Sequence, residues 1–215
     1  CLTQRPWSIN TYLLPKVYHR CHVIALRQCD NKVIKRQINR FLYCDQLEKP
    51  GPLLEYRPRE SGGLQLHDLD CKSRAMLIRS FLEPALISKY QPFPLHEALY
   101  TYYVLEELSI PKPIIPKCYP NEFFLNIRTA VNMGHKVDKM SSRDWYMYLL
   151  NRKTLEHEEE DEDGNISWVT SKCKSETIYP QYKWMEIWSM ARIKGISNKS
   201  RTFMWRMLNN LLPTE

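Results

Sequence analysis

The sequence predicts a mainly α-helical protein: a helical bundle followed by a further helical region with a small β-hairpin near residues 154–170. Two observations carry this prediction. Apolar residues recur three or four positions apart through most of the 215-residue chain, which is the spacing of one face of a helix. An acidic run at 158–163 is the exception, and it ends in Asp163-Gly164, a pair typical of a tight turn between strands.

The first two helices are expected within residues 10–43. Pro15 either marks the start of the first helix or kinks it, because proline is tolerated only in a first turn. Asp30-Asn31 offers an N-cap for the second helix, whose remaining surface is basic. The expected apolar stripes are Leu13, Val17, Cys21 and Ile24 in the first helix, and Val33/Ile34, Gln37/Ile38 and Phe41/Leu42 in the second.

Four more helical stretches follow. Asp68 or Asp70 can cap a helix that closes at Glu83-Pro84. Residues 94–110 and 123–133 have helical spacing, the four prolines between 111 and 120 form an extended linker, and Ser141–Asp144 begins a further helix by capping. In the helix after Asp70 the expected buried stripe is Cys71, Ala75, Ile78 and Leu82, and the expected exposed cations are Lys72, Arg74 and Arg79.

Glycine and tryptophan mark two further features. Gly62-Gly63 permits positive φ or a close approach of the backbone, but it lacks the rest of a nucleotide-binding loop. Trp184, Trp188 and Trp205 could stack on unpaired bases. Their helical spacing favours packing in a core instead.

Charge is distributed unevenly. Residues 1–44 hold eight Lys or Arg and one acid, a surplus equal to the +7 net charge of the whole chain. Residues 151–180 are acidic, with eight acids and four cations, and residues 181–215 are basic again. Basic clusters of this kind are typical of proteins that bind a polyanion, most often nucleic acid, although a solvated helix face without a ligand has the same pattern.

Several classes of protein are excluded or disfavoured. No apolar run is long enough for a membrane helix, so no membrane partner is expected. The seven cysteines include no Cys-x-x-Cys pair, which argues against zinc and disulfides and favours a reducing, intracellular location. His67, Asp68 and Asp70 lack a nucleophile or metal nearby, so no catalytic motif is identified. The chain begins without Met and ends abruptly, and we expect a fragment of a longer protein.

Three stretches, in order, resemble the C-terminal part of a non-LTR (LINE-type) retrotransposon reverse transcriptase. Residues 9–18 with the basic helix to 43 resemble its thumb, and Arg59-x-x-Gly-Gly-Leu-x-Leu-x-Asp-Leu69 is similar to the segment after the thumb. Residues 184–188 and 201–214 look like the lead-in to its zinc-binding region. The polymerase palm, with its paired aspartates, and the fingers are absent.

We expect four segments: a thumb-like basic helical segment at 1–48, a post-thumb helical segment with the Gly-Gly-Leu loop at 49–110, a proline-rich linker with helices and the acidic hairpin at 111–180, and the helical lead-in at 181–215 to a truncated zinc-binding region. The resemblance identifies the first, second and fourth of these segments. It implies RNA template and DNA primer as partners, together with the rest of a polyprotein in the nucleus or cytoplasm. No cofactor is expected within this chain, since Mg²⁺ belongs to the absent palm and zinc to the absent downstream region.

The predicted function is therefore to grip a template–primer duplex by its phosphates and to position it for a palm outside this chain. The alternative is a helical protein-interaction or structural module derived from a retroelement, without nucleic-acid binding. Whether the chain belongs to an enzyme stays open. The candidate nucleic-acid-binding residues are Lys32, Lys35, Arg36, Asn39 and Arg40, with Lys16 and Arg20 as a second row and Arg57, Arg59, Lys72 and Arg74 as weaker candidates.

Overall fold

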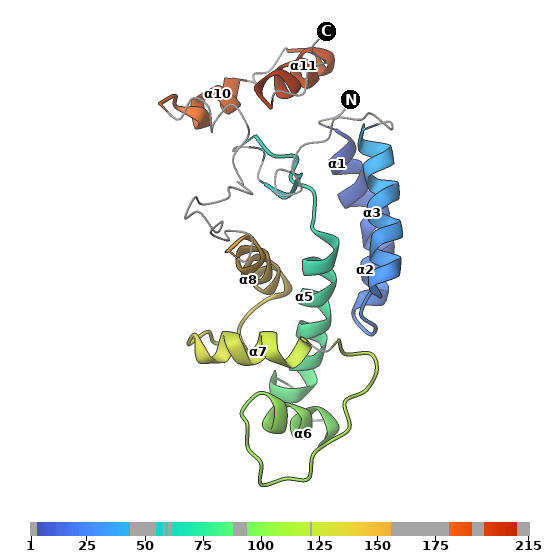
Figure 1. The fold of residues 1–215 in the computed structure, drawn as a ribbon, viewed down its shortest axis with the longest axis vertical. Coiled ribbons are helices and arrows are strands. Elements are labelled where there is room, and N and C mark those ends of the chain that lie inside the picture. Colours follow the sequence, from blue (N-terminus) through green and yellow to red (C-terminus); the bar gives the residue numbers. More distant parts are fainter. Residues whose placement is uncertain are drawn as a thin grey trace, which may run out of the picture. The chain divides into compact units, whose positions relative to one another are not determined.

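A computed structural model describes residues 4–43, 55–57, 59, 62–87, 94–120, 122–155, 181–190 and 196–209. The described chain is mainly helical, as the sequence predicts (Figure 1). Two of its elements are short π-helical turns, η1 and η3. The elements in order are α1 (Arg5–Ser8), η1 (Ile9–Leu13), α2 (Leu14–Cys21), α3 (Gln28–Tyr43), α5 (Leu69–Leu82), η3 (Glu83–Ile87), α6 (Pro94–Tyr103), α7 (Phe123–Asn132), α8 (Ser142–Leu155), α10 (Trp184–Met190) and α11 (Asn198–Leu208).

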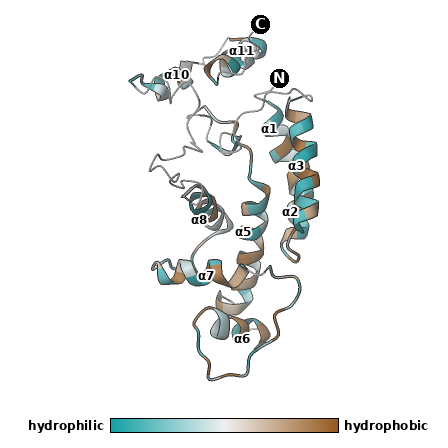
Figure 2. Ribbon diagram, in the orientation of Figure 1, coloured by the Kyte–Doolittle hydropathy of each residue, from teal (hydrophilic) through white to brown (hydrophobic). Residues whose placement is uncertain are grey.

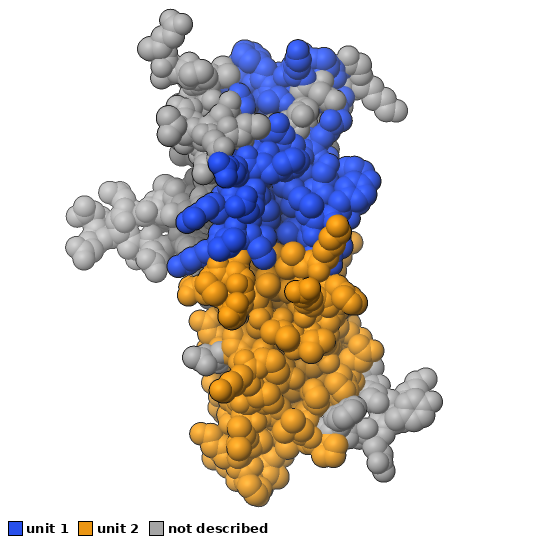
Figure 3. Space-filling model, turned by 90° about the vertical axis from the view of Figure 1, so that its right-hand side faces the viewer, with its two compact units in different colours: residues 1–15, 32–68, 152–215 blue, residues 16–31, 69–151 orange. Residues whose placement is uncertain are grey.

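The chain divides into two compact units that do not follow the order of the sequence (Figure 3). Unit 1 comprises residues 1–15, 32–68 and 152–215, and unit 2 comprises residues 16–31 and 69–151. Unit 1 thus contains α1, η1, most of α3, the Gly-Gly-Leu loop and the C-terminal helices.

The π-helical turn η1 shifts the buried face of the first helical segment. The Leu14 N–H donates to the Ile9 carbonyl, five residues back instead of four. Because the turn holds an extra residue, every later side chain is rotated relative to a continuous α-helix. Leu13 is 50% exposed, so the predicted stripe is wrong there, while Cys21 is buried as expected. The stripe is also wrong at Ile24, which is 61% exposed because α2 ends at Cys21. The residues that are buried are Ile9, Leu14, Tyr18 and Cys21.

Pro15 and Pro84 lie at or next to π-helical turns. Pro15 directly follows the start of α2 after η1, and Pro84 lies within η3. Proline lacks an N–H, and in an α-helix its ring collides with the carbonyl four residues back. A turn with longer-range hydrogen bonds relieves this conflict. The α-helix α5 ends at Leu82, directly before Glu83-Pro84 as predicted, and the π-helical turn η3 continues from there to Ile87.

Helix α3 begins at Gln28, two residues before the predicted cap. Asp30 lies in its first turn, where Arg27 Nε donates to its carboxylate at 2.8 Å. In each predicted apolar pair of α3, the second residue is the more buried one. Ile34 is half-buried and Ile38 and Leu42 are buried, whereas Val33 is 57% exposed and Phe41 is 47% exposed. The helix thus shows both charge and apolar surface.

Helix α5 is the centre of the unit 2 core. All four residues of its predicted stripe are buried, which confirms that prediction. Leu77 and Phe81 are buried as well, so α5 is enclosed on several sides. The Phe81 ring lies edge-on to Phe123 and Phe124, with centroids 5.4 and 5.5 Å apart, in arrangements that aromatic rings prefer. Helix α7 crosses α5 in Figure 1, and brown, hydrophobic segments of both helices are visible in Figure 2.

The remaining helices of unit 2 match the sequence in part. Helix α7 ends one residue before the predicted Met133. A reciprocal cap starts α8, since the Ser141 N–H donates to Asp144 Oδ2 at 2.8 Å and the Asp144 N–H donates to Ser141 Oγ at 3.3 Å, as predicted. Helix α6 stops at Tyr103 and not at residue 110. Residues 111–116 have no regular structure, in agreement with the expected extended stretch.

The predicted β-hairpin is not supported. Helix α8 continues to Leu155, so Thr154, the expected position of the first strand, is helical. The turn at Asp163-Gly164 and the second strand lie outside the described residues. Helix α8 is therefore continuous through Thr154, where the sequence predicted a change from helix to strand. Among the residues described, no strand is formed.

The Gly-Gly-Leu loop joins the parts of unit 1 that are most distant in sequence. Gly62 has φ +79°, and a Cβ there would collide with the Trp188 ring. A Cβ on Gly63 would collide with the Arg57 carbonyl. Trp205 Nε1–H donates to the Gly62 carbonyl at 2.8 Å. Trp188 and Trp205 are buried, which confirms the predicted core packing for these two, whereas Trp184 is half-buried.

Asn10 provides the matching link to the N-terminal segment. Its side-chain nitrogen donates to the Gln65 carbonyl at 2.8 Å, and its oxygen accepts from the His67 N–H at 3.2 Å. The Asn10 amide therefore forms hydrogen bonds with two backbone groups of the loop, as the backbone of a neighbouring strand would. Unit 1 thus holds residues 9–15 and 32–43 of the first stretch together with the Gly-Gly-Leu loop and the C-terminal helices, whereas residues 16–31 belong to unit 2.

Within the described ranges, none of the helices combines the length and the apolar character that crossing a bilayer requires.

Candidate nucleic-acid interface

Helix α3 carries the strongest candidate surface. Lys32, Arg36 and Arg40 lie four residues apart, which places them along one face of the helix. All three are exposed. The opposite face carries Ile38 and Leu42, which are 8% and 0% exposed. Burial of these apolar side chains holds the helix with its three cations, here called the basic stripe, toward solvent.

Two contacts fix the C-terminal end of α3. Arg5 of α1 donates to the Phe41 and Leu42 carbonyls at 3.0 and 2.8 Å, and its guanidinium lies 5.6 Å from the centre of the Phe41 ring. A cation bonded to the last carbonyls of a helix stabilises them and the negative end of the helix dipole. The Tyr43 hydroxyl donates to Glu55 at 2.9 Å in a buried position. Burial, reinforced by the Glu55 carboxylate, raises the pKa of Tyr43, which keeps this hydroxyl a donor.

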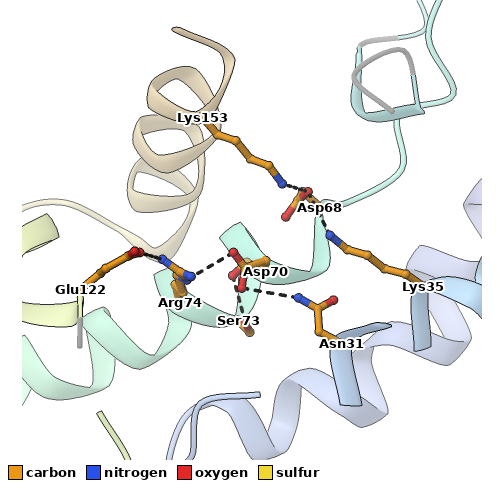
Figure 4. Close-up of polar contacts among 8 residues, drawn as sticks. All are labelled: Asn31, Lys35, Asp68, Asp70, Ser73, Arg74, Glu122 and Lys153. Atoms are coloured by element: carbon orange, nitrogen blue, oxygen red, sulfur yellow. Dashed lines mark hydrogen bonds and ion pairs between the residues drawn. The ribbon is translucent and has the colours of Figure 1, made fainter. Parts of the chain in front are cut away.

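Lys35 differs from the basic stripe. Its ammonium lies 3.8 Å from Asp68, a carboxylate that is completely buried. Lys153 of α8 lies closer to the same oxygen, at 2.8 Å (Figure 4). Two partly exposed lysines thus neutralise one buried acid. A buried carboxylate needs such partners because it has lost its hydration. This pairing commits Lys35 to the fold, and we place it outside the basic stripe. Asn39, beside it on the inner edge of the helix, is half-buried.

The second row, Lys16 and Arg20, is exposed on α2. These residues are also four apart and therefore share a face of that helix. Lys16 and Arg20 belong to unit 2, whereas the basic stripe belongs to unit 1. The two sets of cations are therefore surfaces of different units.

The weaker candidates are less exposed. Arg57 and Arg59 are half-buried beside the Gly-Gly-Leu loop, and the Arg57 carbonyl accepts from the Gln65 N–H at 2.9 Å. Arg74 lies 3.3 Å from Asp70 and 2.7 Å from Glu122, both carboxylates (Figure 4). Lys72 lies 5.4 Å from the centre of the Tyr146 ring. Desolvation, with Arg143 nearby, lowers the pKa of Lys72.

The expectation that the cations of α5 are exposed is wrong. Lys72, Arg74 and Arg79 are all half-buried, and Arg79 donates to the carbonyls of Asp138 and Met140, each at 3.3 Å. Because α5 is enclosed on several sides, even the residues outside its apolar stripe contact other parts of unit 2. The three cations therefore serve first as contacts within unit 2.

Sequence reasoning missed two features of unit 1. Lys153 is a partner of Asp68, a pairing over 85 positions that no local pattern indicates. Trp7 and Tyr12 are exposed aromatic residues at the N-terminal end, at 53% and 59%. Their aromatic character in the most basic part of the chain was the available signal. The described residues contain no group of three or more His, Cys, Asp or Glu side chains that would hold a metal ion.

Comparisons with known proteins add no family assignment: no protein-family model, no curated protein and no solved structure matches this chain.

Proposed function

We propose that this chain is the nucleic-acid-binding thumb and post-thumb portion of a reverse transcriptase of the LINE type. It grips an RNA–DNA template–primer duplex through backbone phosphates and positions the primer end for a palm in another part of a polyprotein. Magnesium would act at that palm and zinc in the region downstream. The observation that carries the proposal is the basic stripe, in which Lys32, Arg36 and Arg40 are exposed on one face of a helix anchored at its far side.

The spacing of the stripe suits a duplex backbone. Residues four apart on a helix rise by about 6 Å, similar to the distance between successive phosphates along a strand. Lysine and arginine in such a row bind phosphates whatever the base sequence, and their affinity falls steeply with salt as counterions are released. Arginine adds bidentate bonds to phosphate oxygens. The stripe therefore supports positioning of a duplex and not readout of a sequence.

The test is fluorescence anisotropy of a labelled RNA–DNA hybrid across a salt series, with the full chain. The variant Lys32→Glu/Arg36→Glu/Arg40→Glu should bind at least roughly tenfold more weakly, and its salt slope should be shallower by roughly two to three. The control variant is Lys112→Glu/Lys117→Glu/Lys139→Glu, which makes the same charge change at exposed positions elsewhere in the chain. Circular dichroism checks that each variant is folded. Equal loss in both variants would show only a general charge effect and would overturn the assignment to α3.

A protein-interaction module is the second candidate, and one observation favours it. Val33 and Phe41 are exposed on α3, at 57% and 47%, beside the basic stripe. Apolar contacts in a groove of a partner protein would depend little on salt. Absence of hybrid binding at low salt by the folded protein would favour this second function.

A further inference from the structure

An exposed pair of aromatic rings lies at the start of unit 1. The centroids of Trp7 and Tyr12 are 5.5 Å apart, and the ring planes meet at 87°. Both side chains are more than half exposed, and Leu13 beside them is 50% exposed. Aromatic residues that leave this much ring surface in water are typical of sites that bind flat or apolar groups.

The π-helical turn creates this pair. In an α-helix, residues five apart do not lie on the same face. The turn η1 begins two residues after Trp7 and contains Tyr12, and its wider winding brings the two side chains together. The same turn turns Leu13 outward and Leu14 into the core. Because π-helical turns are rare and frequently lie at functional sites, the exposed pair is a candidate for a binding role.

A cation, Arg5, lies on the same short helix as Trp7. Arg5, which precedes Trp7 by two residues, holds α1 against the C-terminal end of α3, and Figure 1 shows the two helices side by side. The Phe41 ring under Arg5 is itself 47% exposed. A ligand that combines flat rings with negative charge is complementary to this surface, and a nucleic-acid strand has both properties.

We propose that Trp7 and Tyr12 form a stacking platform for unpaired nucleobases of a single strand that continues from the duplex held by α3. The platform rests on the proposed function and adds a second class of ligand to it. Stacking tolerates any base, so it would increase affinity without sequence preference, as the phosphate contacts do. The grip would then extend from paired to unpaired nucleotides.

The test compares three hybrid duplexes in the anisotropy assay, again with the full chain. One is blunt, one carries a short single-stranded overhang, and one carries an abasic overhang of equal length, which keeps the phosphates and removes the bases. The wild-type protein should prefer the overhang with bases by roughly fivefold or more. Trp7→Ala/Tyr12→Ala should remove this preference and leave binding to the blunt duplex unchanged.

Two further variants separate stacking from a structural effect. Trp7→Phe/Tyr12→Phe retains flat rings and should keep most of the preference. Phe203→Ala removes an aromatic side chain that is 55% exposed on α11 and should change nothing. Equal affinity for the two overhangs, or a preference that persists in the alanine variant, overturns the platform.

The outcomes also distinguish this proposal from the proposed function. If the protein ignores the blunt duplex but binds the overhang with bases through Trp7 and Tyr12, the duplex grip fails and the platform stands. If blunt binding is strong but the bases of the overhang add nothing, the grip stands and the platform fails. Binding to none of the three duplexes overturns both.

Discussion

Helices α3 and α5 carry similar cations but use them differently. The basic stripe of α3 is exposed, whereas the cations of α5 are half-buried and contact carboxylates, carbonyls or a ring of unit 2. Both helices show the same sequence pattern, an apolar stripe with Lys and Arg between its members. The comparison teaches that the pattern identifies the apolar side of a helix, while the surroundings of the other side decide whether a charge is available to a ligand.

The number of buried faces explains the difference. Helix α5 also buries Ser73, Leu77 and Phe81, so packing surrounds it and its cations reach neighbouring elements. Helix α3 buries one side, through Ile38 and Leu42, and leaves the other in water. Phosphate can reach an exposed cation at little desolvation cost, whereas a half-buried cation that contacts a carboxylate must first be separated from it.

The largest expected effect concerns Lys35, the cation of α3 that is paired with a buried acid and not exposed like the basic stripe. Asp68→Asn would remove the buried charge that Lys35 and Lys153 share. We expect the free energy of unfolding to fall by about 2 kcal/mol, less than for a fully buried pair because both lysines are partly exposed. Urea denaturation measures this change. Glu107→Gln, at an exposed acid, is the matched control, and an unchanged unfolding midpoint for Asp68→Asn would contradict a stabilising role for the pairing.

A paired substitution tests the comparison directly. Arg74→Met leaves Asp70 and Glu122 without their shared cation, and we expect a loss of about 1 kcal/mol in stability with unchanged hybrid binding. Arg36→Met, on the basic stripe, should change stability by less than about 0.5 kcal/mol and weaken binding. Urea denaturation and anisotropy on both proteins check these outcomes. A reversed result, with binding lost in the α5 variant, would place the interface on α5.

The smallest effect concerns Asp144, an exposed carboxylate that takes part in the N-terminal cap of α8. Hydrogen bonds from the Ser141 side chain and backbone lower the pKa of Asp144 below its ordinary value near 3.8. A lowered carboxyl pKa contributes stability that is complete above the ordinary value and is lost as the pH falls through the folded value. Asp144→Ala should therefore lower the melting temperature slightly at pH 7, and the difference should shrink near pH 2. A difference that is constant with pH would show that the charge of Asp144 plays no part in the cap.

Local physics made some of the candidate site predictable. The spacing of Lys32, Arg36 and Arg40 determines that they share a face wherever a helix forms there. The stripe of α5 from Cys71 to Leu82 and the cap at Ser141 depend on neighbours within a few residues, and the structure confirms both. The register of the first helix was not predictable in this way, because a π-helical turn before Pro15 rotates all later residues.

The sequence by itself therefore determined the helical class and the position of the positive charge along the chain, and it permitted a close approach of the backbone at Gly62-Gly63. These follow from side-chain period, the absence of a Cβ and composition, which are properties of a few residues at a time. Only the tertiary structure decided that Trp205 bonds to the Gly62 carbonyl, that Lys153 neutralises Asp68, and which cations stay exposed. Those outcomes depend on contacts between residues far apart in the chain. A buried polar group must have a hydrogen-bond or ion-pair partner, but the local sequence does not say which residue that partner is.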